Sequence, residues 1–516
     1  MNEINFISCV LNCRVRVGND VGTIKFIGEL KHHSGLWYGI EWDDPNRGKH
    51  NGCVDGIQYF SCDEPLAGSM IRPEKVRRFE TVRDAIENRY ILTPIEDDLN
   101  FDDFQMVIGA PLMEFVGVEK TWKKQSDIKA LTHVVLPDSN VNAPGDLTPL
   151  KNLSELVLSA SLIWNWQTVG DIVKQIPSLN VLDLSKNRIK QPTEAEISEL
   201  QSIFVFLKSL HLQNCKMKSW TDILHVAQLW PFIDHLSLHG NEIVQLVEPD
   251  LTNCFKNLQS LDLSNNKISN FNEIVKLGNI ETLRCLNVAG NGIKRIELPE
   301  CRSDQQLSIF VNLVELILRD NPIEDKSFAF NELDKLPMLN NLSMSRKGAD
   351  FKDMFSDGAA RISRLKTLNN ILISDVDRRG AEYDLLKMYG PKMLLAKDEL
   401  AKENLFRECR ALSVIFKKYG SPDELLTPAP KVSNVINIEI QTIPFTKTVK
   451  KRLPRKITVQ ALQGIISKLF NPRGSEQPKL SYLDQKNPDI RVELDKVSKS
   501  LDFYSIQDGD VILVEW

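Results

Sequence analysis

The sequence predicts a multidomain protein with three parts: a small β-barrel, an α/β solenoid of repeats and a C-terminal α/β roll. Glycines and aromatic residues punctuate short runs of β-formers near the N-terminus, and a leucine-rich motif then recurs across the middle of the chain. A strand, turn, strand, helix, strand order follows near the end. A chain of 516 residues exceeds the length at which one hydrophobic core keeps growing, so several cores are expected.

The composition excludes several classes of protein. Hydrophobic residues make up 42% and charged residues 26% of the chain, as in ordinary globular proteins, and the formal net charge is -5. Nucleic-acid-binding proteins usually carry a basic excess, so we expect no nucleic-acid partner. The nine cysteines are scattered without a C-x-x-C pair, so we expect reduced thiols, no metal site and no cofactor. No signal peptide is evident at the N-terminus and no apolar run reaches about 18 residues, so we expect a cytoplasmic protein without a membrane partner.

The first module, residues 8–80, reads as short strands broken by glycines. Its segments Gly22–Gly28 and Trp37–Trp42 are rich in β-branched and aromatic residues, which favour strands. Glycine permits positive φ angles and sharp corners. The spacing therefore predicts a small, strongly bent β-barrel.

The order of motifs in this module resembles the CAP-Gly domain. The matching segments are Gly22–Thr23, Gly35–Trp42, Gly48–Gly52, Gly56–Phe60 and Gly68–Pro73. The resemblance implies a site for acidic C-terminal tails that end in Glu-Glu-Tyr/Phe, such as that of α-tubulin. A lysine and backbone N–H donors suit the tail carboxylates, and an apolar slot suits the terminal ring. The residues predicted for this site are Phe26, Trp37, Trp42, Gly48, Lys49, His50, Asn51, Gly52, Met70 and Arg72.

The resemblance also implies roles within this site. Lys49 is expected to pair with the tail carboxylates, and Arg72 to lie near the rim. Phe26, Trp37 and Trp42 are expected to wall the apolar slot. Core packing is the alternative interpretation for the two tryptophans.

Three positions differ from the family's pattern. His50 and Asn51 replace the Asn and Asp of the Gly-Lys-Asn-Asp-Gly motif. Met70 stands where an aromatic residue is common. Because methionine is flexible, Met70 can still fill an apolar slot.

The predicted solenoid, residues 126–350, repeats the pattern L-x-x-L-x-L-x-x-N-x-I. Successive copies begin at Leu153, Leu179, Leu207, Ile233, Leu258, Leu283, Leu313 and Leu339, so the period is 25 to 30 residues. This period is typical of leucine-rich repeats, in which each copy places one short strand on a concave wall. The asparagine of each copy is expected to hydrogen-bond the turning backbone, which is a structural role.

Function is expected on the strand positions that point into the concave face. Alternation along each strand places the residues beside the buried leucines there. They are mostly small and polar, which suits a protein surface better than a small-molecule pocket. We expect protein binding through Asp183, His211, His235, His239, Asp262, Asn287 and Arg319. A metal site formed by the three histidines is the weaker alternative to solvated contact residues.

The remaining segments complete the expected domain organisation. Residues 81–125 are predicted to be a linker, and residues 351–430 a helical cap followed by a proline-containing linker. In residues 431–516, strands are expected at both ends and an amphipathic helix over 458–470. The segment Lys499–Asp510 is similar to the turn before the last strand of ubiquitin, so the resemblance implies a ubiquitin-like β-grasp domain.

The chain shows no catalytic signature: the P-loop, H-E-x-x-H and G-x-S-x-G patterns are all missing, so no enzyme is expected. The order of its three modules resembles the tubulin-folding cofactor E family. This resemblance implies a cytoplasmic, cytoskeleton-associated chaperone that binds α-tubulin through both its acidic tail and its folded body. It implies a role in assembling and dissociating the α/β-tubulin heterodimer together with other tubulin-folding cofactors.

Two questions stay open from the sequence. The partner of the ubiquitin-like domain is tubulin, another cofactor or the proteasome. The alternative function is a microtubule-end adaptor that uses the CAP-Gly module for tubulin tails and the repeats for a protein cargo. Such adaptors usually carry coiled-coil heptads or a basic flank, and neither is found in this sequence, which favours the chaperone.

Overall fold

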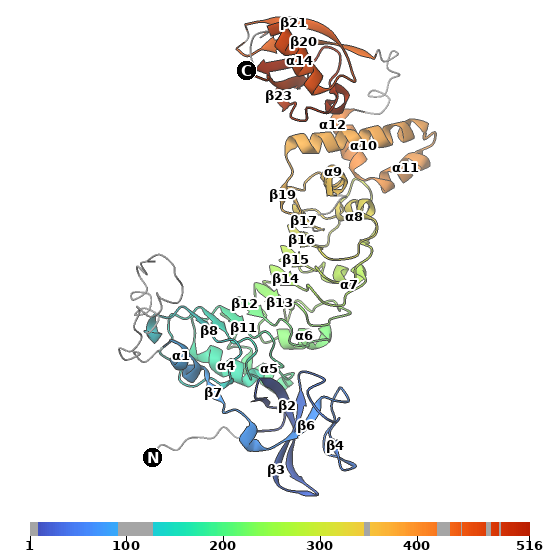
Figure 1. Cartoon of the computed structure of the whole chain (residues 1–516). Helices are drawn as coiled ribbons and strands as arrows, with labels where there is room; N and C mark the ends of the chain where they lie inside the picture. The colour runs from blue at the N-terminus through green and yellow to red at the C-terminus, as the bar shows by residue number, and fades with distance from the viewer. Residues whose placement is uncertain are drawn as a thin grey trace, which may run out of the picture. The chain divides into compact units, whose positions relative to one another are not determined.

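A computed structural model describes residues 9–90, 127–344, 351–420, 434–444, 446–470, 476–484 and 487–516. The chain divides into two compact units. The first comprises Met1–Ile373 and Phe406–Ala411, and the second comprises Ser374–Leu405 and Leu412–Trp516. The β-barrel and the solenoid belong to the first unit, and the ubiquitin-like domain belongs to the second (Figure 1).

The N-terminal module is built on one antiparallel sheet. Its strands, in spatial order, are β1 (Arg14–Val17), β2 (Asp20–Leu30), β3 (His33–Trp42) and β6 (Gly68–Ile71). The short strands β4 (Cys53–Val54) and β5 (Ile57–Gln58) pair separately, and a 3-10 turn, η1 (Pro73–Lys75), follows β6. The core under the sheet consists of Cys13, Val15, Ile24, Ile40 and Trp42. This is the small glycine-rich β module that the sequence predicts.

The segment predicted as a linker begins as folded structure. Strand β7 (Glu80–Thr81) pairs in parallel with β9 (Val141–Ala143), and helix α1 (Val82–Tyr90) follows with its apolar side buried. The Glu80 N–H donates to Asn140 O at 3.2 Å, and the Asn140 N–H donates to Glu80 Oε1 at 2.9 Å. The linker prediction is therefore wrong for residues 81–90, which bind the start of the solenoid; the rest of that linker lies outside the described residues.

The solenoid carries a single sheet of eleven strands, parallel except for the last pair. In order these are β8 (His133–Val135), β10 (Glu155–Val157), β11 (Val181–Asp183), β12 (Ser209–His211), β13 (His235–Ser237), β14 (Ser260–Asp262), β15 (Cys285–Asn287), β16 (Glu315–Ile317), β17 (Asn341–Ser343), β18 (Thr367–Leu368) and β19 (Ile371–Leu372). The helical turns between them are η2 (Ile128–Ala130), α4 (Trp166–Gln175), α5 (Glu194–Leu200), α6 (Trp220–Ala227), α7 (Phe271–Val275), α8 (Lys326–Leu333) and α9 (Phe351–Arg361). Helices α6, α7 and α8 lie on the side of the solenoid opposite the strands (Figure 1).

The repeat asparagines hold neighbouring turns together. The Asn266 side-chain NH₂ donates to Leu238 O at 3.1 Å and to Leu263 O at 2.9 Å. Its Oδ1 accepts the backbone N–H groups of Asn241 and Ile243, both at 3.0 Å. A buried backbone group without a hydrogen-bond partner destabilises the fold, so this side chain stabilises the tight turn after each strand by bonding those groups.

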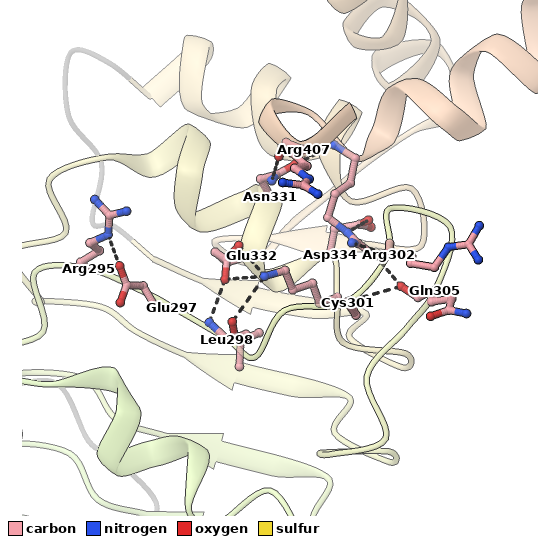
Figure 2. Close-up of polar contacts among 12 residues, drawn as sticks. Arg295, Glu297, Leu298, Cys301, Arg302, Gln305, Asn331, Glu332, Asp334 and Arg407 are labelled. Atoms are coloured by element: carbon pink, nitrogen blue, oxygen red, sulfur yellow. Dashed lines mark hydrogen bonds and ion pairs between the residues drawn. The ribbon is translucent and has the colours of Figure 1, made fainter. Parts of the chain in front are cut away.

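The solenoid ends in a cap that extends the sheet beyond the predicted boundary at residue 350. Helix α9 and strands β18 and β19 continue the repeat geometry after the leucine motif has decayed. The segment Phe406–Ala411 then binds α8. The Asn331 side chain donates to Arg407 O at 2.8 Å (Figure 2). In return, the Arg410 N–H donates to Asn331 Oδ1 at 2.7 Å. The buried Arg410 guanidinium reaches Asp334 Oδ2 at 3.5 Å.

The second unit begins with three helices, α10 (Asp375–Leu395), α11 (Glu399–Glu408) and α12 (Ala411–Tyr419), of which short parts belong to the first unit. Buried Glu382 of α10 accepts hydrogen bonds from Lys418 Nζ and Tyr419 Oη, both at 2.6 Å. These bonds join the first and third helices of the group. The helix-rich region predicted before the last domain is therefore present.

The C-terminal domain is a β-grasp roll with the strand order β21-β20-β24-β22-β23. Its elements are β20 (Val435–Thr442), β21 (Thr448–Pro454), α14 (Val459–Phe470), β22 (Lys479–Asp484), β23 (Asn487–Glu493), η3 (Leu501–Tyr504) and β24 (Val511–Glu515). Strands β20 and β24 are parallel neighbours at the centre of the sheet. Ile436, Ile438 and Ile440 of β20 share one core with Leu462 and Ile466 of α14. This confirms the ubiquitin-like fold class.

Candidate functional site

The loop Gly48–Gly52 of the barrel lies directly on the start of β6. The Lys49 backbone N–H donates to Gly68 O at 2.7 Å. Gly52 has a φ of +99°, and a Cβ atom there would lie 2.0 Å from Phe60 O, so only glycine fits. The Lys49 side chain is exposed, and within the described residues its ammonium group has no ion-pair partner. The loop backbone is therefore anchored, while the Lys49 side chain stays open to a ligand.

An apolar row runs across the sheet beside this loop. Phe26, Gly39 and Met70 stand opposite one another on β2, β3 and β6. Because Gly39 has no side chain, the Phe60 ring and Phe26 close over it, and a Cβ atom there would lie 2.5 Å from the Phe60 ring. Tyr59 packs edge-to-face on Phe26 with ring centroids 5.2 Å apart. Sequence reasoning did not include Tyr59 and Phe60 in the site, although their glycine-flanked motif was the signal for them.

Trp37 lies on the same face of β3 as Gly39, two residues along the strand. The Arg72 guanidinium stacks on its ring at 3.8 Å from the centroid and donates to Leu36 O at 3.3 Å. The Trp37 indole N–H is covered but has no hydrogen-bond partner within the described part of the chain. A covered donor without a partner is unusual, and this one is not open to a ligand.

Trp42 lies on the opposite face of β3 and does not wall the slot. Successive residues of a strand point to opposite faces, so Trp37 and Trp42, five positions apart, separate. Trp42 is 2% exposed, packs with Val15 and Ile40, and donates from Nε1 to Ser69 Oγ at 3.0 Å. Core packing, the alternative for both tryptophans, thus applies to Trp42, which we remove from the site.

His50 and Asn51 perform a local backbone function in place of the family's Asn and Asp. The His50 Nδ1 accepts the Gly52 N–H at 3.0 Å, and the Asn51 Oδ1 accepts the Cys53 N–H at 3.4 Å. Each bond reaches two residues ahead, as an asparagine side chain does in an Asx turn. Burial, and secondarily the charge of Lys49, lowers the pKa of His50. The imidazole is therefore neutral at pH 7, with its proton on Nε2.

On the solenoid, four of the predicted concave-face residues share one register position. Asp183, Asp262 and Asn287 stand in the row that also contains His211. Each accepts the backbone N–H of the residue two positions later, at 2.7 Å for Asp183, 2.9 Å for Asp262 and 3.1 Å for Asn287. These side chains thus terminate their strands as well as facing the concave side, a structural role that sequence reasoning did not assign.

The predicted histidines do not converge. His211 bonds Ser209 Oγ within its own strand at 3.2 Å, and His239 bonds Ser264 Oγ at 2.9 Å. His235 stands in a different row and is exposed. Within the described residues, no three His, Cys, Asp or Glu side chains are placed to hold a metal ion. Arg319, at the other end of the face, donates to Ser343 Oγ at 3.2 Å.

The described helices include none that is both long enough and apolar enough to cross a membrane. In the β-grasp sheet, Ser481 of β22 is buried and accepts a hydrogen bond from Arg491 Nε at 2.8 Å. Arg491 also pairs with Glu515 at 2.7 Å. This part of the β-grasp sheet is therefore polar and internally bonded.

Two family models match parts of this chain. The CAP-Gly domain family matches residues 11–76, and the leucine-rich repeat family matches residues 257–277. Among solved structures, the C-terminal ubiquitin-like domain of mouse tubulin-specific chaperone e is 30% identical and covers 17% of this chain and 93% of its own, with a TM-score of 0.15. An internalin C2 of Listeria monocytogenes is 24% identical and covers 42% and 83%, with a TM-score of 0.28.

Similarity to several characterised proteins extends over nearly the whole chain. Tubulin-specific chaperone E of Drosophila melanogaster is 43% identical over 516 residues, which are 98% of each chain. The protein of the same name from Danio rerio is 34% identical over 526 residues, again 98% of each chain, and that from Bos taurus is 34% identical over 535 residues, 99% of each. Since this identity spans the barrel, the solenoid and the β-grasp domain together, the chain belongs to the tubulin-specific chaperone E family.

Proposed function

We propose that this protein is a non-enzymatic chaperone that binds α-tubulin at two places and helps to assemble and dissociate the α/β-tubulin heterodimer in the cytoplasm. The barrel binds the acidic C-terminal tail, and the concave face of the solenoid binds the folded body. The name shared by its full-length relatives supports tubulin as the substrate. Other tubulin-folding cofactors are the expected further partners.

The observation that carries the tail-binding half is the exposed cation of Lys49 on a loop locked to β6, beside an apolar row. An acidic tail with a terminal ring needs a cation for its carboxylates and an apolar surface for its ring. Lys49 supplies the cation, and Phe26 and Met70, both partly exposed, supply the surface.

The concave face supports the second contact. Its rows of serine, asparagine, aspartate and histidine form a broad polar surface without a described metal cluster. Such a surface recognises a large protein better than a small molecule. Two separate contacts on one partner raise the affinity, because binding at one holds the other at a high effective concentration.

The test is size-exclusion chromatography of the full chain with purified soluble tubulin, followed by titration of an α-tubulin tail peptide. We expect a stoichiometric complex with soluble tubulin. Lys49→Ala should weaken peptide binding about 10-fold or more, because it removes a charge-assisted contact of roughly 1.5–3 kcal/mol. The control is Lys174→Ala, which removes an equally exposed lysine from α4. Co-sedimentation with polymer without any soluble complex would instead identify a microtubule-end adaptor.

A further inference from the structure

The barrel is joined to the solenoid by a shared carboxylate. Asp43, directly after β3, accepts a bidentate pair of bonds from the buried guanidinium of Arg14 in the barrel. The same carboxylate accepts Arg188 of the solenoid, with Nη1 3.1 Å from Asp43 Oδ1. Arg188 Nη2 also donates to Asp43 O at 3.5 Å. Asp43 therefore connects two arginines that are 174 positions apart in the sequence.

Two further contacts reach different turns of the solenoid. Arg16, 4% exposed, pairs through Nη1 with Asp138 Oδ1 at 2.7 Å and donates from Nη2 to Ala160 O at 3.2 Å. Trp164, just before α4, packs against the hydrophobic core of the barrel, among residues that include Val15. One apolar anchor and two separate ion-pair contacts cannot all be kept if the barrel rotates on the solenoid.

The chain connection adds to this restraint. Strand β7 leaves the barrel and pairs at once with β9 of the solenoid, and helix α1 follows. The direct path from barrel to solenoid is thus a paired strand rather than a free linker. A barrel on a flexible linker would not need Arg16 buried against Asp138 and Ala160 of the solenoid, because these bonds restrict how the barrel can turn.

We propose that Asp43, Arg188 and Trp164 are positioning residues that hold the tail-binding loop at a fixed orientation to the solenoid, so that the barrel and the concave face act as one binding surface. This inference rests on the proposed function for its consequence but not for its geometry. Asp43 also lies in the segment that leads into the loop Gly48–Gly52, so the anchor and the loop share one stretch of backbone. A ligand with two parts then meets both surfaces without first ordering the protein.

The geometry is tested in the free protein. A fluorescent donor and acceptor are introduced as unnatural amino acids at the exposed positions Asp55 and Glu281, and the distance distribution is measured by time-resolved energy transfer. The wild type should show one narrow distribution, and Arg188→Ala with Trp164→Ala should broaden it. The control pair is Arg295→Ala with Phe232→Ala, which removes the same kinds of side chain from the solenoid away from the barrel. If the double variant is unstable, Arg188→Gln alone tests the same point.

The functional consequence is measured separately. The double variant should bind the isolated tail peptide within about twofold of the wild type, whereas its affinity for intact tubulin should fall about 10-fold or more, because a loosely held pair of sites loses effective concentration. A broad distribution in the wild type, or a narrow one in the double variant, would overturn the proposal. Equal losses for peptide and tubulin would also overturn it. If no form of the protein binds tubulin, the proposed function fails. The distance measurement then still shows whether the barrel is held at one orientation on the solenoid.

Discussion

Replacing Asn266 by alanine should destabilise the middle of the solenoid far more than its single lost amide suggests. The four shortest hydrogen bonds of this side chain, 2.9–3.1 Å long, go to backbone groups of its own and the preceding repeat. It is 7% exposed, so water does not replace these partners. At a net value of about 1 kcal/mol for each bond, the loss is about 4 kcal/mol. The effect reaches function, because β14, which carries Asp262, ends directly before this turn.

The assay is urea denaturation followed by the fluorescence of buried tryptophans, of which Trp220 and Trp230 lie in the repeat that begins at Leu207. The comparison is with Asn312→Ala, since Asn312 is exposed and makes one hydrogen bond, to Glu281 O at 2.9 Å. That control should shift stability by less than about 0.5 kcal/mol. If both variants unfold at the same urea concentration, the asparagine ladder does not hold the repeats together and the reasoning is wrong.

Four other predictions concern the binding surfaces, the stability of the barrel and the C-terminal domain. Asp262→Asn should keep the bond to the Ser264 N–H, because Asn287 makes the same bond at the same position. We expect the variant to lose affinity for tail-cleaved tubulin without losing melting temperature, which would identify the Asp262 charge as a contact. Unchanged affinity would exclude that contact. His50→Asn should keep tail-peptide affinity within about threefold, whereas His50→Ala should lose more, because only the asparagine can accept the Gly52 N–H; calorimetry distinguishes them. The pKa of His50 is lowered in the folded barrel, so its contribution to stability is complete above its unfolded pKa of about 6.5 and is lost as the pH falls through the folded pKa. Urea midpoints measured from pH 7.5 to 5 should show this loss in the wild type, and His50→Asn should abolish it. Deleting residues 431–516 should preserve tubulin binding but abolish heterodimer dissociation, because opening a large interface needs several contacts acting together; subunit exchange at the full-length rate would give that domain another role, such as contact with the proteasome.

Most of the architecture could be predicted from the sequence, because it depends on patterns within a few residues or one repeat. The leucines and asparagines of each repeat encode which side of a strand is buried and how the chain turns after it. The glycines of the barrel mark the places where backbone approaches backbone, as at Gly52. These features depend on neighbours within a few residues or one repeat, so one sequence contains the whole signal.

Site residues were harder to predict where membership in the site depended on which face of a strand a side chain lies on. Trp37 and Trp42 belong to one aromatic motif, and both suited a tail slot by composition. Only the bounds and pairing of β3 showed that Trp37 shares the face of Gly39 while Trp42 enters the core. The same register showed that the side chains of Asp262 and Asn287 each accept a backbone N–H of their own turn, besides facing the concave side.

By itself the sequence determined the three modules, their order and the loop that carries Lys49, because each is a local or periodic property of the chain. The tertiary structure alone decided that residues 80–90 join the solenoid and that Arg14 and Arg188 share Asp43. A contact between residues more than a hundred positions apart depends on how folded surfaces fit, and no spacing in one sequence encodes that fit. The orientation of the tail-binding barrel on the solenoid is therefore a property of packing and paired charge, not of motif.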